Sequence, residues 1–119
     1  MQPSVIERNM KPHIHVEEAR RFFLNQSSYE RQLNHFIHLQ KDVAERILTS
    51  FQNGDWSAAE RESHSLKGNA ATLGMLPLRE ISAELESLLK QQADAPSIEE
   101  AISSLAQELK EVIDVIERM

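Results

Sequence analysis

The sequence of 119 residues contains no cysteine, three glycines, four prolines and only 5% aromatic residues. Without cysteine, disulfides, thiolate metal sites and cysteine nucleophiles are excluded. So few glycines and prolines argue against an all-β sandwich, which needs many turns. No apolar run approaches the ~20 residues of a membrane helix, and no basic start followed by an apolar stretch indicates a signal peptide. We therefore expect no direct membrane contact, and the sequence is compatible with a cytoplasmic location.

Basic residues are in the minority, with 13 Lys and Arg against 19 Asp and Glu and a formal net charge of −6. This charge disfavours binding to the phosphates of a nucleic acid. Hydrophobic residues make up 40% and charged residues 27% of the chain, as is typical of a soluble globular protein. A chain of this length buries one modest core, which predicts a single domain. We place that domain at residues 17–119, after an irregular segment at residues 1–16 that contains Pro3 and Pro12.

Apolar residues recur at spacings of three and four through most of the sequence, which predicts helices. The expected elements are a short helix at residues 17–24, a long helix at residues 29–51, a third helix between Asp55 and Gly74, a fourth that begins near Pro77, and a last one at residues 98–116. Ser28 is the expected N-cap of the long helix, and Ser97 with Glu100 matches a capping box before the last one. Four helices joined by short loops predict an all-α fold, an antiparallel four-helix bundle with a short additional N-terminal helix.

Gly68 is the one glycine that does not fall at an expected helix end. It lies inside the third helix, where Gly costs about 1 kcal/mol relative to Ala. At about 100° per residue, His64, Lys67 and Gly68 share one face of that helix, opposite its apolar stripe. The sequence therefore predicts that His64 points to solvent, with Lys67 one turn along and no side chain at Gly68.

These three residues suit the transfer of a phosphoryl group. A neutral exposed imidazole is a nucleophile near neutral pH. A nearby cation such as Lys67 stabilises the charge on the oxygens of a phosphoryl group in transfer. The missing bulk at Gly68 would let a partner domain bring that group in line with His64. Because phosphohistidine is a high-energy N–P linkage that can pass its group to a carboxylate, the trio suits a relay better than a hydrolase.

The sequence of residues 64–74 is His-Ser-Leu-Lys-Gly-Asn-Ala-Ala-Thr-Leu-Gly. It strongly resembles the signature H-x-L-K-G-x-A-x-x-L-G of histidine-containing phosphotransfer (HPt) domains, and every specified position matches. The resemblance extends to Asp55-Trp56, similar to the start of the family's helix, and to Leu85-Glu86, similar to a trailing Leu-Glu pair. The departures are small, since Ser63 and Ser82 stand where the family often has Ala.

The resemblance implies a relay module that is not an enzyme and has no ATP site of its own. His64 matches the phosphorylated histidine, Lys67 the lysine that stabilises the phosphoryl group, and Gly68 the glycine that gives access. Glu86 falls where the family often has an amide or acid near the imidazole. We predict that Glu86 accepts a hydrogen bond from Nδ1–H of His64, which leaves Nε2 as the nucleophile.

The resemblance also implies the partners. The phosphoryl group would come from an aspartate of one response-regulator receiver domain and pass to an aspartate of another. No cofactor is expected on this chain, because the Mg²⁺ of the reaction belongs to the receiver. Part of the cluster Phe22-Phe23-Leu24 is expected to border the docking face, since partners of this kind bury an apolar patch around the reactive residue.

The sequence resembles most closely the C-terminal module of a bacterial hybrid sensor histidine kinase. In that case its parent is bound to the inner membrane and this part faces the cytoplasm. A free-standing phosphotransfer protein is the second interpretation, and the N-terminal domain of a chemotaxis kinase is the third. We expect a monomer, because one bundle can bury all of the apolar stripes.

Two other functions compete with the relay. In a helical adaptor, His64 would be an incidental surface residue. A metal-dependent enzyme would use the spare histidines, His35 with His38 and His13 with His15, as ligands. Nothing in the sequence brings these pairs together and no H-E-x-x-H motif is present, so we predict no metal site. A kinase is disfavoured because the sequence has no Gly-rich phosphate loop.

Overall fold

The computed structural model describes residues 13–119, and within them it contains helices and no strand. The helices are α2 (Val16–Arg20), α3 (Gln26–Gln40), α4 (Val43–Gln52), α5 (Trp56–Thr72), α6 (Leu76–Lys90) and α7 (Ala95–Glu117). The predicted all-α class is confirmed. Most of the expected irregular segment, residues 1–12, lies outside the described residues, and residues 13–15 are not helical. The proposed domain boundaries stay a prediction.

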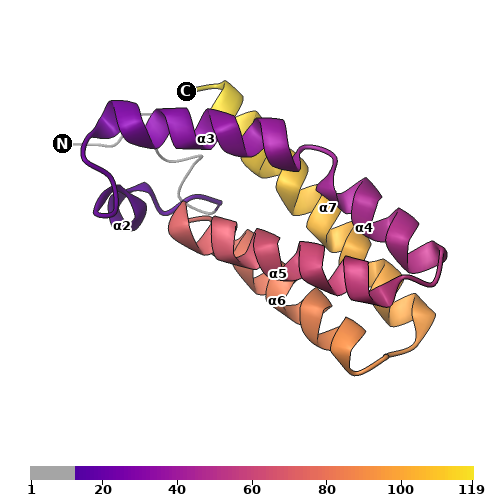
Figure 1. Cartoon of the computed structure of the whole chain (residues 1–119). Helices are drawn as coiled ribbons and strands as arrows, with labels where there is room; N and C mark the ends of the chain where they lie inside the picture. Colours follow the sequence, from indigo (N-terminus) through magenta and orange to yellow (C-terminus); the bar gives the residue numbers. More distant parts are fainter. Residues whose placement is uncertain (1–12) are drawn as a thin grey trace.

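The helices form a bundle of four antiparallel columns with α2 at one end (Figure 1). The first column consists of α3 followed by α4, and α5, α6 and α7 are the other three. α5 packs along both α4 and α6, and α7 packs along α4 and α6 from the other side. None of the helices among residues 13–119 is long and apolar enough to cross a membrane.

The predicted apolar stripes meet in a single core between these columns. Its large, fully buried side chains include Tyr29, Leu33, Val43, Ile47, Leu66, Leu78, Leu85, Ile98, Leu105 and Val112. Burying a large apolar side chain of this kind is worth roughly 1.5–3 kcal/mol. Because the inward face of α5 is buried in this core, its opposite face is exposed to solvent.

The predicted long helix at residues 29–51 is wrong in one respect, since it is broken into α3 and α4. Lys41 keeps helical backbone angles, but Asp42, with φ −106° and ψ 11°, does not. The apolar spacing gave no sign of this break, because Gln40 and Val43 are buried on either side of it at the normal interval of three. Gln40 is a buried polar side chain whose Oε1 has no hydrogen-bond partner among the described residues.

Both predicted serine caps are also wrong, and for the same reason. Asn25 caps α3, and its side chain accepts a hydrogen bond from the Ser28 backbone N–H at 2.8 Å. Asp94 caps α7 and accepts from the Ser97 N–H at 3.1 Å. Each serine therefore lies three residues after the true cap and donates to it, as an N3 residue does. As a result, both helices begin before the predicted residue.

The short helix α2 ends at Arg20 rather than at the predicted Leu24 and packs against the end of α5. The backbone N–H of His15 donates to the Gly74 carbonyl at 2.6 Å. Gly74 has φ +78°, and a Cβ at this position would lie 2.5 Å from the His15 carbonyl oxygen and 2.9 Å from the Ala19 Cβ. Gly74 is therefore required both by its backbone conformation and by the close approach of α2.

Tyr29 closes the same end of the bundle. Its hydroxyl donates to the Leu73 carbonyl at 3.0 Å, and its ring packs against Phe23 with ring centroids 5.3 Å apart. Burial raises the pKa of Tyr29 to about 12, so that the hydroxyl keeps its proton and donates it at neutral pH. This contact joins α3 to the end of α5, next to the turn between α5 and α6.

Candidate functional site

α5 positions the motif residues. Asp55 caps the helix, as predicted, by accepting from the Ala58 N–H at 3.1 Å. The buried residues of α5 are Ala59, Ser63, Leu66 and Ala70. Ser63 fits this inward face because its hydroxyl donates to the Ala59 carbonyl at 2.9 Å. His64 lies on the outward face, and its side chain is 68% exposed.

His64 contacts a buried carboxylate from the neighbouring helix. Its Nδ1 lies 2.6 Å from Oε2 of Glu86 on α6, whose side chain is only 7% exposed. An ionised carboxylate can only accept a hydrogen bond, so the imidazole proton is on Nδ1. The Nε2 atom is therefore the nitrogen with a free lone pair. In the structure Glu86 thus contacts Nδ1 of His64, and its role in transfer stays a prediction.

Lys67 contacts the second oxygen of the same carboxylate. Its Nζ donates to Glu86 Oε1 at 2.6 Å, and its side chain is 33% exposed. The ammonium group is thus held on the Nδ1 side of the imidazole, within one turn of His64. The sequence predicts that Lys67 stabilises a phosphoryl group. In this structure its hydrogen-bond partner is Glu86.

Lys90 is a site residue that the sequence reasoning missed. Its Nζ lies 3.8 Å from Glu86 Oε2 and 4.0 Å from Glu60 Oε1. The available signal was its position four residues after Glu86 on one helix, where a Glu-Lys pair shares a face. Glu86 therefore faces two ammonium groups, those of Lys67 and Lys90, in addition to the imidazole.

The environment of Glu86 decides its ionisation. Burial by itself raises the pKa of Glu86, but the hydrogen bonds from Lys67 and His64 and the charges of Lys67 and Lys90 oppose it, and the net result is a pKa below the ordinary value of 4.5. The carboxylate is ionised at neutral pH. It can therefore orient the imidazole and balance a positive charge that develops on it.

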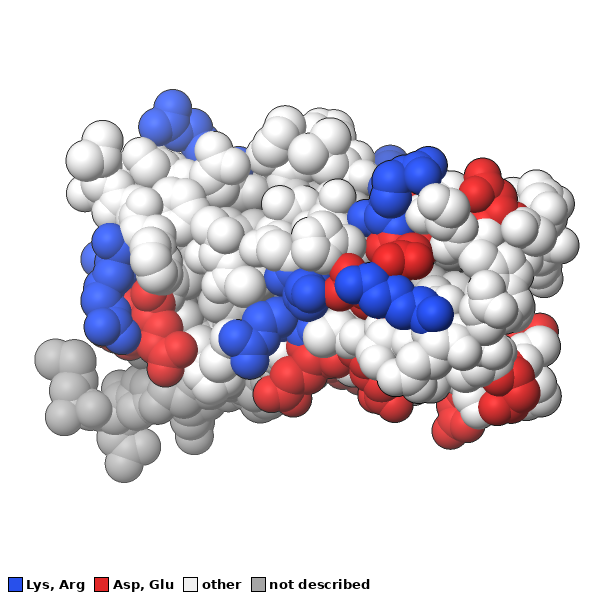
Figure 2. All heavy atoms as spheres, turned by 60° about the horizontal axis from the view of Figure 1, so that its bottom comes forward, with Lys and Arg blue, Asp and Glu red and all other residues white. Residues whose placement is uncertain are grey.

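Gly68 lies on the same exposed face as His64, and a Cβ at this position would meet nothing within 4 Å. No contact within the described part of the chain therefore requires a glycine here. Figure 2 turns the underside of Figure 1, with α5 and α6, towards the reader. Basic and acidic side chains touch in the middle of this face, and a broad area without charged residues lies beside them.

The cluster Phe22-Phe23-Leu24 divides between core and surface. Phe23 packs against the core, whereas Phe22 and Leu24 rank among the exposed large hydrophobic residues. They follow α2 at the end of the bundle where α5 terminates. Whether they border a docking face stays a prediction.

The spare histidines are not brought together as two pairs. Within residues 13–119, His35 and His38 belong to no group of three potential metal ligands. His13 instead faces Glu108 and Glu111 of α7. Sequence reasoning could not find this group, because 95 residues separate His13 from Glu108.

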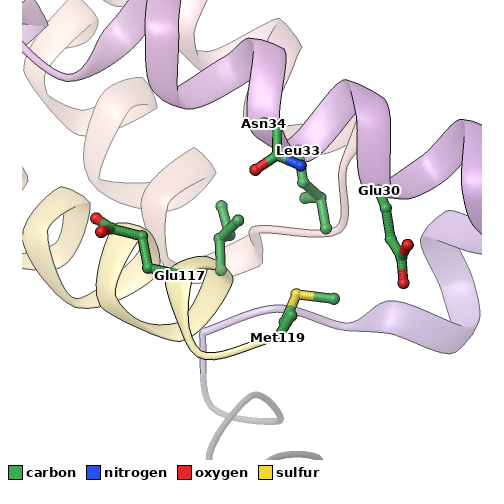
Figure 3. A pocket seen from close by; sticks show the side chains of 6 residues that line it. Glu30, Leu33, Asn34, Glu117 and Met119 are labelled. Carbon is green, nitrogen blue, oxygen red and sulfur yellow. The ribbon is translucent and has the colours of Figure 1, made fainter.

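A pocket of about 410 Å³ lies between α3 and the C-terminal end of α7 (Figure 3). It is lined by Glu30, Leu33, Asn34, Ile116, Glu117 and Met119. None of the four predicted site residues lines it. Two of its six lining residues are glutamates and none is a histidine or a basic residue, so that it offers no constellation for phosphoryl chemistry.

Within residues 13–119, the helical bundle thus presents an imidazole on its surface beside a buried carboxylate and a lysine. The sequence model of the family described as Hpt domain matches residues 32–117, and the chain belongs to this family. It therefore has a phosphotransfer role in a phosphorelay. Domains of this family carry no kinase site of their own and interact with receiver domains of response regulators.

A curated relative supports the same assignment. The chain is 30% identical over 78 residues to Phosphotransferase RcsD of Escherichia coli (strain K12). The match covers 66% of this chain and 9% of that protein. The chain thus spans a small part of the relative's length. No solved structure matches the chain significantly.

Proposed function

We propose that His64 carries the phosphoryl group, accepting it from an aspartate of one receiver domain and passing it to an aspartate of another. The observation that supports this most directly is the 2.6 Å hydrogen bond between Nδ1 of His64 and Glu86. It leaves Nε2 unprotonated on a side chain that is 68% exposed. A receiver domain can therefore approach a nucleophile that is already in the correct tautomer.

The proposed transfer needs no external base, because every bond and charge is accounted for by the imidazole, the phosphoryl group and the aspartate. The Nε2 lone pair attacks phosphorus, the N–P bond forms, and the P–O bond to the aspartate breaks, so that the carboxylate leaves. The ring gains positive charge because the proton stays on Nδ1. The ionised Glu86 stabilises that charge through the same hydrogen bond. In the second step an aspartate of the next receiver attacks phosphorus, the N–P bond breaks, and His64 returns to its neutral form.

Lys67 has to change partner during this cycle. In the present structure its ammonium binds Glu86 Oε1. We infer that it turns towards the phosphoryl oxygens once they arrive, because the group in transfer carries negative charge. Lys90, 3.8 Å from Oε2, remains beside Glu86 and limits the charge left uncompensated. The Mg²⁺ used in the reaction is supplied by the receiver domain.

In this proposal, the absence of a side chain at Gly68 lets the receiver domain approach His64. A Cβ there would meet no atom of this chain, so the glycine is best explained by the partner. Because helical Gly costs about 1 kcal/mol relative to Ala, we infer that the receiver backbone or its phosphoryl group passes close to this position.

Incubation with a phosphorylated receiver domain tests the proposal. The wild type should acquire acid-labile, base-stable phosphate, and His64→Gln should acquire none. His35→Gln is the matched control, since His35 is also an exposed helical histidine and its loss should not change labelling. Equal labelling of wild type and His64→Gln would contradict the proposal. Absence of label on all proteins, with receiver binding retained by His64→Gln, would favour the helical adaptor instead.

The context of the domain is a second part of the proposal. We propose the C-terminal module of a hybrid sensor kinase, on the cytoplasmic side of the membrane, with a free-standing protein as the alternative. The presence of a similar segment within a much longer relative is compatible with a module of a larger protein. We also propose a monomer, since the predicted apolar stripes are buried within one bundle. Light scattering of the purified chain checks the monomer, and a mass of twice 13.6 kDa would contradict it.

A further inference from the structure

A second cluster of ionisable side chains lies where the start of the described chain crosses α7. Nδ1 of His13 lies 2.8 Å from Oε2 of Glu108, and Nε2 of His13 lies 3.6 Å from Oε2 of Glu111. The two glutamates are three residues apart on α7 and therefore share a face. The side chain of Glu108 is 11% exposed, whereas that of Glu111 is 43% exposed. Two segments that are distant in sequence thus converge on one point.

The relay proposed above does not use this cluster. It involves neither α5 nor α6, and it combines two carboxylates with one imidazole. The group therefore has more acidic than basic side chains in a partly buried place, which favours a cationic partner. One ligand atom from each of the three residues lies within 4.8 Å of the others. A divalent cation placed among them would remove the excess charge.

We propose that His13, Glu108 and Glu111 form a binding site for a divalent transition metal ion, with Zn²⁺ as the best fit. A set of imidazole and carboxylate donors is one that Zn²⁺ accepts, at about 2.0–2.2 Å for each bond. The ion takes the place of the proton between Nδ1 of His13 and Glu108, and that proton moves to Nε2. Water completes the coordination. Glu111, whose Oε2 lies 3.6 Å from Nε2 of His13, has to turn its exposed side chain towards the Nδ1 side of the ring to reach the ion.

The site would fasten the N-terminal segment to α7. Ile14, next to His13, is buried in the core, and His15 donates its backbone N–H to Gly74 at the end of α5. An ion at His13 therefore joins the beginning of the described chain to both α7 and the end of the motif helix. Because the ion would bind the folded state and not the unfolded one, it stabilises the bundle by mass action.

Calorimetric titration of the untagged, metal-free protein with ZnCl₂ tests this site, with thermal unfolding as a second readout. We expect one site per chain and a rise in Tm of about 4 °C or more at saturation. His13→Gln and Glu111→Gln should each weaken binding by more than about tenfold, whereas His35→Gln should bind as the wild type does. Glu111 is exposed enough that its variant will fold, as far-UV circular dichroism can verify.

Three results would overturn the proposal. The first is the absence of binding heat with no shift in Tm, which would leave His13 as an ion-pair partner only. The second is unchanged Zn²⁺ affinity in Glu111→Gln. The third is loss of binding in His35→Gln, which would place the ion elsewhere. These readouts do not depend on phosphoryl transfer, so they separate this site from the function proposed for His64.

Discussion

Nδ1 of His64 and Oε2 of Glu86 lie 2.6 Å apart, across the contact between α5 and α6. This contact joins an exposed side chain to a buried one. It fixes the tautomer of the imidazole, and it ties His64 to the core of the bundle through α6. The same carboxylate binds Lys67, so that the imidazole, the ammonium group and the carboxylate form one hydrogen-bonded unit.

Lys67→Ala should slow phosphoryl transfer by about 100-fold, because a cation near the group in transfer contributes on that scale. The fold should persist, since Glu86 keeps its contacts with His64 and Lys90. Single-turnover transfer from a phosphorylated receiver measures the rate. Lys110→Ala, at an exposed position on α7, is the matched control. A wild-type rate in Lys67→Ala would remove the role assigned to this lysine.

Glu86→Gln should change how stability depends on pH. The folded pKa of Glu86 is below its ordinary value of 4.5, so its ionisation contributes stability that is present above pH 4.5. That contribution is lost as the pH falls through the depressed folded pKa. The free energy of unfolding, measured by urea denaturation, should therefore decrease less in acid for Glu86→Gln than for the wild type. If the free energy of unfolding fell equally with pH in both proteins, the pKa of Glu86 would not be lowered in the folded state.

Gly68→Leu should block transfer while it stabilises the isolated domain. Leu favours a helix over Gly by roughly 0.8 kcal/mol, and the space beyond the Gly68 backbone is open. Transfer should be lost because the added side chain occupies the approach to His64. Thermal unfolding and transfer assays on the same sample check both effects. A variant that is more stable and transfers normally would contradict our explanation of this glycine.

Gly74→Ala should have the opposite effect on stability. The residue has φ +78°, and the added Cβ would overlap the His15 carbonyl and the Ala19 side chain. We expect a loss of at least about 1–2 kcal/mol. The comparison with Gly54→Ala is informative, because Gly54 has φ +80° with open space around it. Equal losses at the two positions would show that backbone strain alone, and not the packing of α2, sets the cost.

The sequence predicted the class of fold and the face of α5 that carries the site, because both depend on local periodicity. Apolar residues three and four apart indicate which side of a helix is buried, and this placed His64 and Gly68 outside. The helix starts were predicted less well. Ser28 and Ser97 have the chemistry of caps, but Asn25 and Asp94, three residues earlier, accept hydrogen bonds from the backbone N–H groups of these serines and occupy the cap positions.

Contacts between distant segments were beyond the reach of the sequence patterns. The break after Gln40 leaves the apolar spacing intact, so no pattern revealed it. Lys90 reaches Glu60 only through the packing of α6 beside α5. Likewise, the convergence of His13 with Glu108 and Glu111 depends on where the chain before α2 crosses α7. Glu86 was predicted beside His64 only through the resemblance to a family.

The position of the phosphoryl group on the imidazole tests the central claim most directly. Two-dimensional ¹H–¹⁵N and ³¹P NMR of the domain, phosphorylated by a receiver, distinguishes substitution at the two ring nitrogens. Our account predicts phosphorylation of His64 at Nε2, with Nδ1 still protonated and hydrogen-bonded to Glu86. Phosphorylation at Nδ1, or on any residue other than His64, would contradict it.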